Sequence, residues 1–173
     1  MKKDTRKYAF EWRLLGDLAA GRPTLGPSTR LEAYRLMQFS LRDVVEQHVG
    51  THMADRLFFE AGQLAGGKFF DHLVSPVGSL EEFVSKVQGL FKELNIGLLK
   101  VEKNDVASGE LVLTVSEDLD CSGLPDLDTE VCAYDEGLIC GLLERFTGKS
   151  VKVKEIDCWA SGDRTCRFAA KIG

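Results

Sequence analysis

The sequence lacks the features that mark several large classes of protein. It has no basic excess: 22 Lys and Arg stand against 27 Asp and Glu, for a formal net charge of −5, whereas phosphate binding needs a basic surface. The longest apolar runs are far too short to span a bilayer. The first residues, M-K-K-D-T-R-K-Y, lead into an amphipathic segment and not into the apolar core of a secretion signal. We therefore expect a cytoplasmic protein with no membrane span and no nucleic-acid partner.

Two chemical motifs are also absent. No G-x-G-x-x-G unit joins a strand to a helix, so the sequence offers no nicotinamide-binding fingerprint. No C-x-x-C pair, the signature of the commonest zinc modules, occurs either. No acid–base constellation stands out, and the sequence accordingly predicts no catalytic site and no enzyme. In a reducing compartment the five cysteines point to metal, redox chemistry or burial before disulfides.

Composition and length fit one globular domain. The 173 residues are 44% hydrophobic and 28% charged, which is enough to bury a core. The stretch G-R-P-T-L-G-P-S (Gly21–Ser28) interrupts the amphipathic pattern. We expect a single domain over residues 1–173, with a helical arm over residues 1–27 and a core over residues 28–173.

Three helices are expected in the first half of the core. Thr29 and Glu32 have the spacing of a capping box for a helix that runs to about Val49. A second helix over residues 53–70 should turn inward Leu57, Phe58, Ala61, Leu64 and Ala65, and a third covers residues 79–94. The first two carry more apolar residues than one stripe needs, including Leu36, Phe39 and Phe59. A second apolar face needs a partner, so we expect a homodimer.

The second half alternates with period two. Strands are expected over residues 96–102 and 110–116, joined by the turn N-D-V-A-S-G at 104–109. A helix capped by Asp128 or Thr129 should run to about Phe146, before a hairpin over residues 151–168. This order predicts an α+β fold: helices packed on a mainly antiparallel four-stranded sheet, with a zinc-bound helix–hairpin unit at the C-terminus.

The cysteines of the last third suggest a metal site. Cys132 should lie in the first turn of a helix, where the dipole favours a thiolate. A three-residue loop, Ser161–Asp163, would place Cys158 opposite Cys166. Glu155 can join these thiolates only if a bulge or a strong twist interrupts strand alternation, and Cys121 is the alternative fourth ligand. Buried thiols that only pack, or a redox switch, are the rival interpretations. Cys140 lies mid-helix among apolar residues, where it should pack in the core.

Two motifs give the chain a family resemblance. C-S-G-L-P at 121–125, followed by V-C-A-Y-x2-G at 131–137, and E-x2-C-W-A-x-G-D-x2-C-R-F at 155–168 closely resemble the 4-vinyl reductase domain family. That family is related in fold to Bet3-type and haem nitric-oxide-binding domains, and its members are usually dimeric ligand-binding modules. In its aromatic sensors a zinc ion is bound at the positions of Cys132, Glu155, Cys158 and Cys166. The resemblance therefore implies one structural zinc and favours Glu155 as the fourth ligand.

The resemblance also implies an apolar pocket. We expect it between the helices over residues 53–70 and 79–94 and the first two strands, lined by Phe58, Phe83, Val87 and Phe91. The aromatic sensors hold phenol with a histidine and a tryptophan, a pair that cannot be matched because the only tryptophans are Trp12 and Trp159.

The expected function is a zinc-stabilised sensor or carrier domain for an apolar ligand: a hydrocarbon, an aromatic or a tetrapyrrole-related compound. Its output would pass through dimerisation or a signalling protein partner. The alternatives are a dimeric interaction adaptor without exchangeable ligand and an accessory factor in pigment vinyl reduction.

Overall fold

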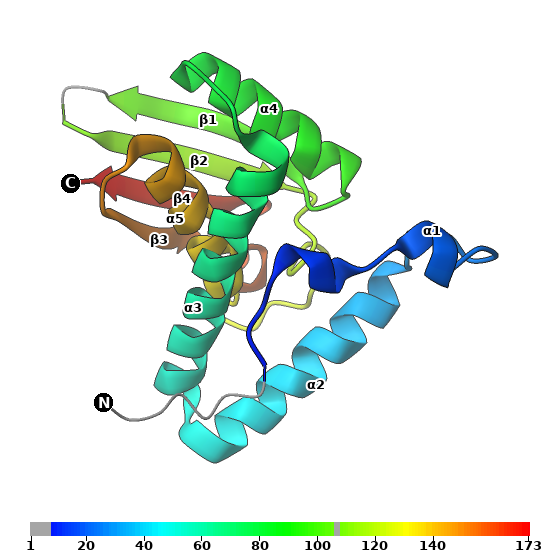
Figure 1. Cartoon of the computed structure of the whole chain (residues 1–173). Coiled ribbons are helices and arrows are strands. Elements are labelled where there is room, and N and C mark those ends of the chain that lie inside the picture. The colour runs from blue at the N-terminus through cyan, green and yellow to red at the C-terminus, as the bar shows by residue number, and fades with distance from the viewer. Residues whose placement is uncertain (1–7, 106–107) are drawn as a thin grey trace, which may run out of the picture.

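The computed structural model describes residues 8–105 and 108–173, and within them the chain forms one antiparallel sheet with helices on one face (Figure 1). The strands are β1 (Leu98–Asp105), β2 (Glu110–Ser116), β3 (Val151–Asp157) and β4 (Cys166–Ile172). They are ordered β1-β2-β4-β3, and every neighbouring pair is antiparallel. The predicted α+β class with a four-stranded sheet is confirmed. Part of the predicted turn at 104–109 lies outside the described residues.

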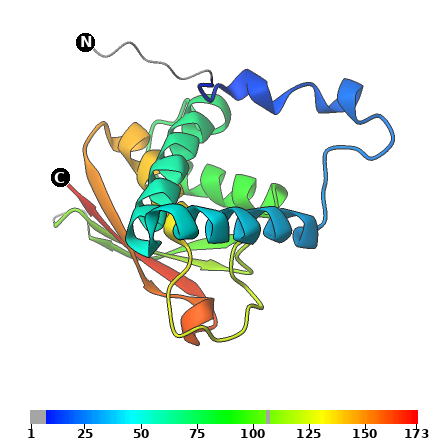
Figure 2. The ribbon, with the colours of Figure 1, turned by 90° about the horizontal axis from the view of Figure 1, so that it is seen from below.

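The helix α5 (Ala133–Thr147) is the centre of the fold. Nine consecutive residues of α5, from Asp135 to Leu143, are buried. On one side α5 packs against the sheet, and on the other it packs along α3 (Thr51–Phe69). The helix α4 (Leu80–Glu93) covers β1, and a π-helical turn, η2 (Phe70–Val74), extends α3 (Figure 2). This layering encloses the core and buries both ends of the β2–α5 connection.

The packing of α3 on α5 depends on glycines. Gly62 and Gly66 of α3 face Gly137 and Gly141 of α5. A Cβ atom built at Gly62 would lie 2.0 Å from the carbonyl oxygen of Tyr134, and one at Gly137 would lie 2.0 Å from that of Phe59. The two backbones are therefore in direct contact.

This contact overturns the predicted orientation of α3. The side chains expected to face inward lie outside: Leu57 is 43% exposed and Leu64 is 49% exposed. The buried positions of α3 are Ala54, Gly62, Gly66, Gly67 and Phe69. Hydrophobic periodicity chose the wrong face because small residues, which carry little hydrophobicity, allow the closest approach of two helices.

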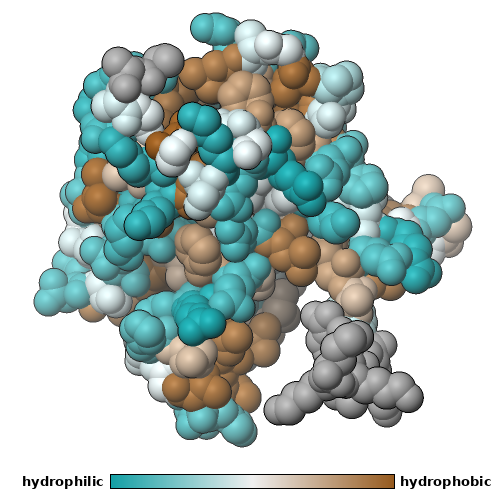
Figure 3. Space-filling view, turned by 60° about the vertical axis from the view of Figure 1, so that its left-hand side comes forward, coloured by the Kyte–Doolittle hydropathy of each residue, from teal (hydrophilic) through white to brown (hydrophobic). Residues whose placement is uncertain are grey.

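The helix α2 (Leu31–Val49) has no buried residue and lies along the outside of α3. Its N-cap is Arg30, whose guanidinium pairs with Glu32, so the predicted capping box of Thr29 and Glu32 is wrong. Before it, the arm contains a 3₁₀ turn, η1 (Trp12–Leu15), and the short helix α1 (Leu18–Gly21), and it runs across the ends of the other helices (Figure 2). Apolar surface gathers at the lower end of the molecule, at the height where α2 turns into α3 (Figure 3).

Other element boundaries differ modestly from expectation. The Ser79 hydroxyl accepts from the backbone N–H of Glu82, as a capping box requires. The helix α5 begins later than expected: its N-cap is Cys132, and neither Asp128 nor Thr129 caps it. Among the described residues, no helix has the length and apolarity needed to cross a membrane. The division into arm and core stays a prediction.

Substitution of one glycine in each of two helices should have opposite effects. Gly137→Ala forces α3 and α5 apart, so the free energy of unfolding should fall by about 1–3 kcal/mol. Gly89→Ala is the matched control, because Gly89 lies in α4 with nothing within 4 Å of its built Cβ. It should gain up to about 1 kcal/mol. Urea denaturation measures both, and a Gly137→Ala variant as stable as wild type would refute the backbone contact.

Candidate functional site

Four buried thiols converge at the N-terminus of α5. Cys121 lies in the loop after β2, Cys132 caps α5, Cys158 caps the 3₁₀ turn η3 (Trp159–Ser161), and Cys166 begins β4. Each is 0% exposed. Their sulfur atoms all lie within 4.8 Å of one another, with Cys121 and Cys166 at 3.0 Å and Cys132 and Cys158 at 3.7 Å. We call these four residues the thiol centre.

The geometry of the hairpin explains how both of its thiols reach the centre. Up to Glu155, alternate residues of β3 are buried, and a register shift then follows between Glu155 and Asp157. The bulge that the sequence analysis requires is thus present. The strands are joined by residues 158–165, which include η3, so the predicted three-residue loop is wrong. In this turn the Ser161 hydroxyl accepts from the Cys158 backbone N–H at 3.2 Å.

Glu155 lies beside the thiol centre. It is 2% exposed, its Oε2 accepts from the backbone N–H of Cys132 at 3.2 Å, and its Oε1 is buried without a hydrogen-bond partner. Burial raises the pKa of Glu155 to about 9. The structure therefore brings Cys132, Cys158 and Cys166 together as predicted. The fourth group whose ligand atom falls within the cluster is Cys121, with Glu155 as a neighbour.

The thiol centre has the donor chemistry that zinc prefers. Hydrogen bonds from the Cys121, Cys132 and Cys166 thiols lower the pKa of Cys158, and the same sharing raises the pKa of Cys132. Without a cation, four thiols this close cannot all ionise, because like charges repel. A divalent metal removes that conflict, and four thiolates form a closed tetrahedral zinc site. The residues present fit this metal.

Three buried aspartates adjoin the thiol centre, and the sequence analysis missed them. The carboxylate of Asp118 accepts from the backbone N–H groups of Asp120 and Cys121 at 2.8 and 3.1 Å, which shapes the loop that presents Cys121. Burial raises the pKa of Asp118 to about 7. One ligand atom each from Asp118, Cys132 and Asp135 lie within 4.8 Å of one another. Carboxylates in the first turn of a helix are common enough to give no signal in sequence.

A cavity of about 450 Å³ lies between α2, α3, α5 and the arm. Its lining is mostly apolar, and the polar side chains in it are Tyr34, Asp120, Tyr134 and Asp135. The arm contributes part of the wall: Trp12 lines the cavity and stacks on His72, with ring centroids 4.8 Å apart. We call this space the arm cavity. Its other lining residues are Phe10, Leu15, Ala65, Phe69, Leu73, Leu94, Ile96, Leu119 and Leu138.

The four residues predicted to line a pocket do not line the arm cavity. Phe83, Val87 and Phe91 are buried in the core beneath α4, where Phe83 stacks on Phe146 with centroids 4.5 Å apart. Phe58 lies apart from them on α3, with the Arg42 guanidinium 5.4 Å from its ring centroid. Their role as ligand contacts stays a prediction, and the arm cavity lies closer to the thiol centre.

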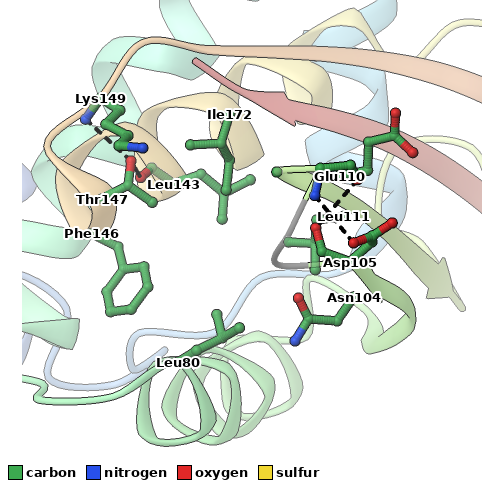
Figure 4. Close-up of a pocket in the computed structure, with 12 residues that line it drawn as sticks. Leu80, Asn104, Asp105, Glu110, Leu111, Leu143, Phe146, Thr147, Lys149 and Ile172 are labelled. Carbon is green, nitrogen blue, oxygen red and sulfur yellow. Dashed lines mark hydrogen bonds between the residues drawn. The ribbon is translucent and has the colours of Figure 1, made fainter.

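A second hollow, of about 360 Å³, lies at the opposite end of α5. Leu80, Leu143, Phe146 and Ile172 surround it, with Asn104 and Glu110 along its rim (Figure 4). Asn104 and Lys149 are exposed, and none of the buried charged side chains lines this hollow. It therefore offers a ligand no buried polar anchor.

Comparison with known sequences supports the family resemblance over part of the chain. The profile of the 4-vinyl reductase domain matches residues 111–172. An uncharacterised protein of Methanocaldococcus jannaschii is 29% identical over 118 residues, which cover 68% of this chain and 65% of that protein. Two further proteins of this organism are matched over 52% and 46% of their lengths, so the chain spans about half to two thirds of these relatives.

Solved structures share the fold. The phenol-responsive sensory domain of the transcription activator PoxR, determined with phenol, has a TM-score of 0.64 and 16% identity, covering 83% of this chain and 75% of that one. A vinyl-4-reductase family protein from M. jannaschii has a TM-score of 0.61 and 17% identity, covering 86% and 84%. Trafficking protein particle complex subunit 3 from Naegleria fowleri and an H-NOX protein from S. oneidensis have TM-scores of 0.64 and 0.53.

At these identities the likeness to solved structures concerns the fold, while the profile match carries the family. The match covers β2, α5, β3 and β4, and therefore contains all four cysteines of the thiol centre. The resemblance to the 4-vinyl reductase domain family is confirmed, and residues 111–172 are the part of this chain that matches the family.

Proposed function

We propose that the chain is a zinc-stabilised domain that binds a small apolar molecule and acts as a sensor or carrier. The observation that carries this proposal is the arm cavity, an apolar space with a few buried polar groups at one end, beside a centre of four thiols. Binding sites for small molecules are concave, mostly apolar and anchored by few polar groups. The fold shared with a phenol-responsive sensory domain supports the same function.

The zinc in this proposal is structural. Four protein ligands leave no open position for water or substrate. The ligands come from the β2–α5 loop, the start of α5, the end of β3 and the start of β4, so one ion would join four segments. Cys132, Cys158 and Cys166 are three of the ligands. Sulfur geometry favours Cys121 as the fourth, and the unpartnered Oε1 of Glu155 keeps that carboxylate as the alternative.

The ligand in this proposal is a hydrocarbon, an aromatic or a tetrapyrrole-related compound, and the domain is not an enzyme. The described residues around the arm cavity include no nucleophile beside a base. The protein would be an accessory factor in pigment vinyl reduction if its ligand were a tetrapyrrole. It would be an interaction adaptor if nothing exchangeable entered the cavity.

We further propose a homodimer formed through α2. The helix has no buried residue, yet Leu36 is 74% exposed, Met37 is 56% exposed and Leu41 is 50% exposed. Leu57 and Leu64 of α3 continue this apolar surface. A helix of 19 residues without a buried position gains little from tertiary packing, so a second copy supplies the missing contact.

Metal content should separate the thiol centre from the remaining cysteine. Protein purified without chelator should hold about one zinc per chain, since four thiolates close the coordination sphere. Cys132→Ser, Cys158→Ser and Cys166→Ser should lose the zinc, and their free energy of unfolding should fall by several kcal/mol. Cys140→Ser is the matched control, because the buried Cys140 thiol bonds the carbonyl of Val151, outside the centre.

The fourth ligand follows from two further variants in the same measurement of metal content, made by emission spectroscopy. Loss of zinc in Cys121→Ser with retention in Glu155→Gln would assign Cys121, and the reverse would assign Glu155. Zinc-free wild-type protein would contradict the metal site altogether.

Filling the arm cavity should block ligand uptake without removing the metal. Ala65 lines the cavity from α3, and Ala65→Trp places a ring inside it. Small aromatics and hydrocarbons should raise the melting temperature of the wild type but not of this variant, while Phe83→Trp and Phe91→Trp test the pocket predicted beneath α4. If no such compound shifts the wild-type melting temperature, the adaptor alternative takes over.

The dimer can be tested by light scattering at micromolar concentration. The wild type should give twice the chain mass of 19.2 kDa. Leu36→Glu should shift it toward the monomer because it buries a charge in the interface. Lys100→Glu, on the exposed part of β1, serves as the control for added negative charge. A monomeric wild type would count against the interface.

A further inference from the structure

The inner end of the arm cavity holds two carboxylates that are not fully used by the protein. Asp120 is 2% exposed and Asp135 is 7% exposed, and both line the cavity. One oxygen of each, Oδ2, is buried and has no hydrogen-bond partner. Buried polar atoms in proteins are almost always hydrogen-bonded, so two unpartnered acceptors in one apolar cavity call for a donor.

The surroundings hold these carboxylates in place but set no cation in the cavity wall. The Tyr34 hydroxyl donates to Asp120 Oδ1 at 2.8 Å, which leaves Oδ2 free to face a ligand. None of the residues that line the cavity is Lys, Arg or His. The nearby Arg35 guanidinium donates instead to the carbonyl oxygens of Leu119 and Ser122. A donor for the two free oxygens must therefore come from outside the cavity wall.

We propose that the arm cavity takes a molecule with an apolar body and one hydrogen-bond-donating head, a protonated amine, which lies between Asp120 and Asp135. This inference rests on the proposed ligand-binding function and names the chemistry of its ligand. Ionised carboxylates only accept hydrogen bonds, and bonds between an ammonium group and a carboxylate are about twice as strong as neutral ones. The body would pack against Phe69, Leu73 and Leu138.

The position of the anchor also fits the architecture. Asp120 directly precedes Cys121, and Asp135 lies one turn after Cys132, so both carboxylates are fixed by the segments that carry the thiol centre. On the outer side, Phe10 and Trp12 of the arm cover the apolar part of the cavity. The ligand head would therefore sit on rigid elements, while its body would contact the arm.

Four compounds of matched shape test the proposal by titration calorimetry on the full chain: phenethylamine, phenethyl alcohol, ethylbenzene and phenylacetate. All share a benzene ring with a short tail and differ in the head group. The amine should bind at least about tenfold more tightly than ethylbenzene, the alcohol should fall between them, and phenylacetate should not bind. This series needs no variant and is therefore independent of any folding defect.

Two shape-preserving variants then locate the anchor. Asp120→Asn and Asp135→Asn should weaken phenethylamine binding about tenfold and leave ethylbenzene binding unchanged. Zinc content and circular dichroism report whether each variant is folded. Asp163→Asn, which removes an exposed carboxylate outside the cavity, controls for the change in net charge.

The outcomes separate this proposal from the broader one. Ethylbenzene or the alcohol binding as tightly as the amine, or unchanged amine binding in both variants, would overturn the carboxylate anchor and leave small-molecule binding intact. Binding of none of the four compounds would overturn both. Selective binding of the amine, lost in the two variants, would support both.

Discussion

The convergence of four buried thiols on the first turn of α5 is the constraint around which the structure is arranged. The β2–α5 loop, the start of α5, the turn after β3 and the start of β4 must all meet there. A bulge in β3, a 3₁₀ turn capped by Cys158 and the Asp118 carboxylate each adjust the backbone toward that point. A metal ion at this position would join these four segments into one rigid unit.

The central helix links the thiol centre to the arm cavity. Cys132 and Asp135 lie within one turn of α5, so a side chain of the cavity and a side chain of the centre share the same backbone. The glycine contact with α3 fixes how closely α3 and α5 approach and thereby sets the width of the space beneath the arm. In this arrangement the centre supplies rigidity, and the surface of α2 and α3 is left for a second copy.

Local pattern was enough to predict the element order, the sheet and three of the four thiols, because these depend on periodicity and on the spacing of cysteines in one hairpin. It placed α3 on the wrong face, although glycines four residues apart in both α3 and α5 are a visible signal for close helix packing. The arm cavity could not be predicted. Its walls come from Trp12, Tyr34, Phe69 and Asp135, which only the tertiary fold brings together. Cys121 was recognised as an alternative ligand, but only its position in the folded loop favours it over Glu155.

The most direct test of the account is X-ray absorption at the zinc edge on the purified full chain, which reports the atoms bound to the metal. Ligation by Cys121, Cys132, Cys158 and Cys166 predicts a first shell of four sulfur atoms at about 2.3 Å. Three sulfurs with one oxygen would move the fourth position to Glu155 and leave the centre in place. A first shell of nitrogen and oxygen alone, or a sample without zinc, would contradict the claim that this thiol centre organises the domain.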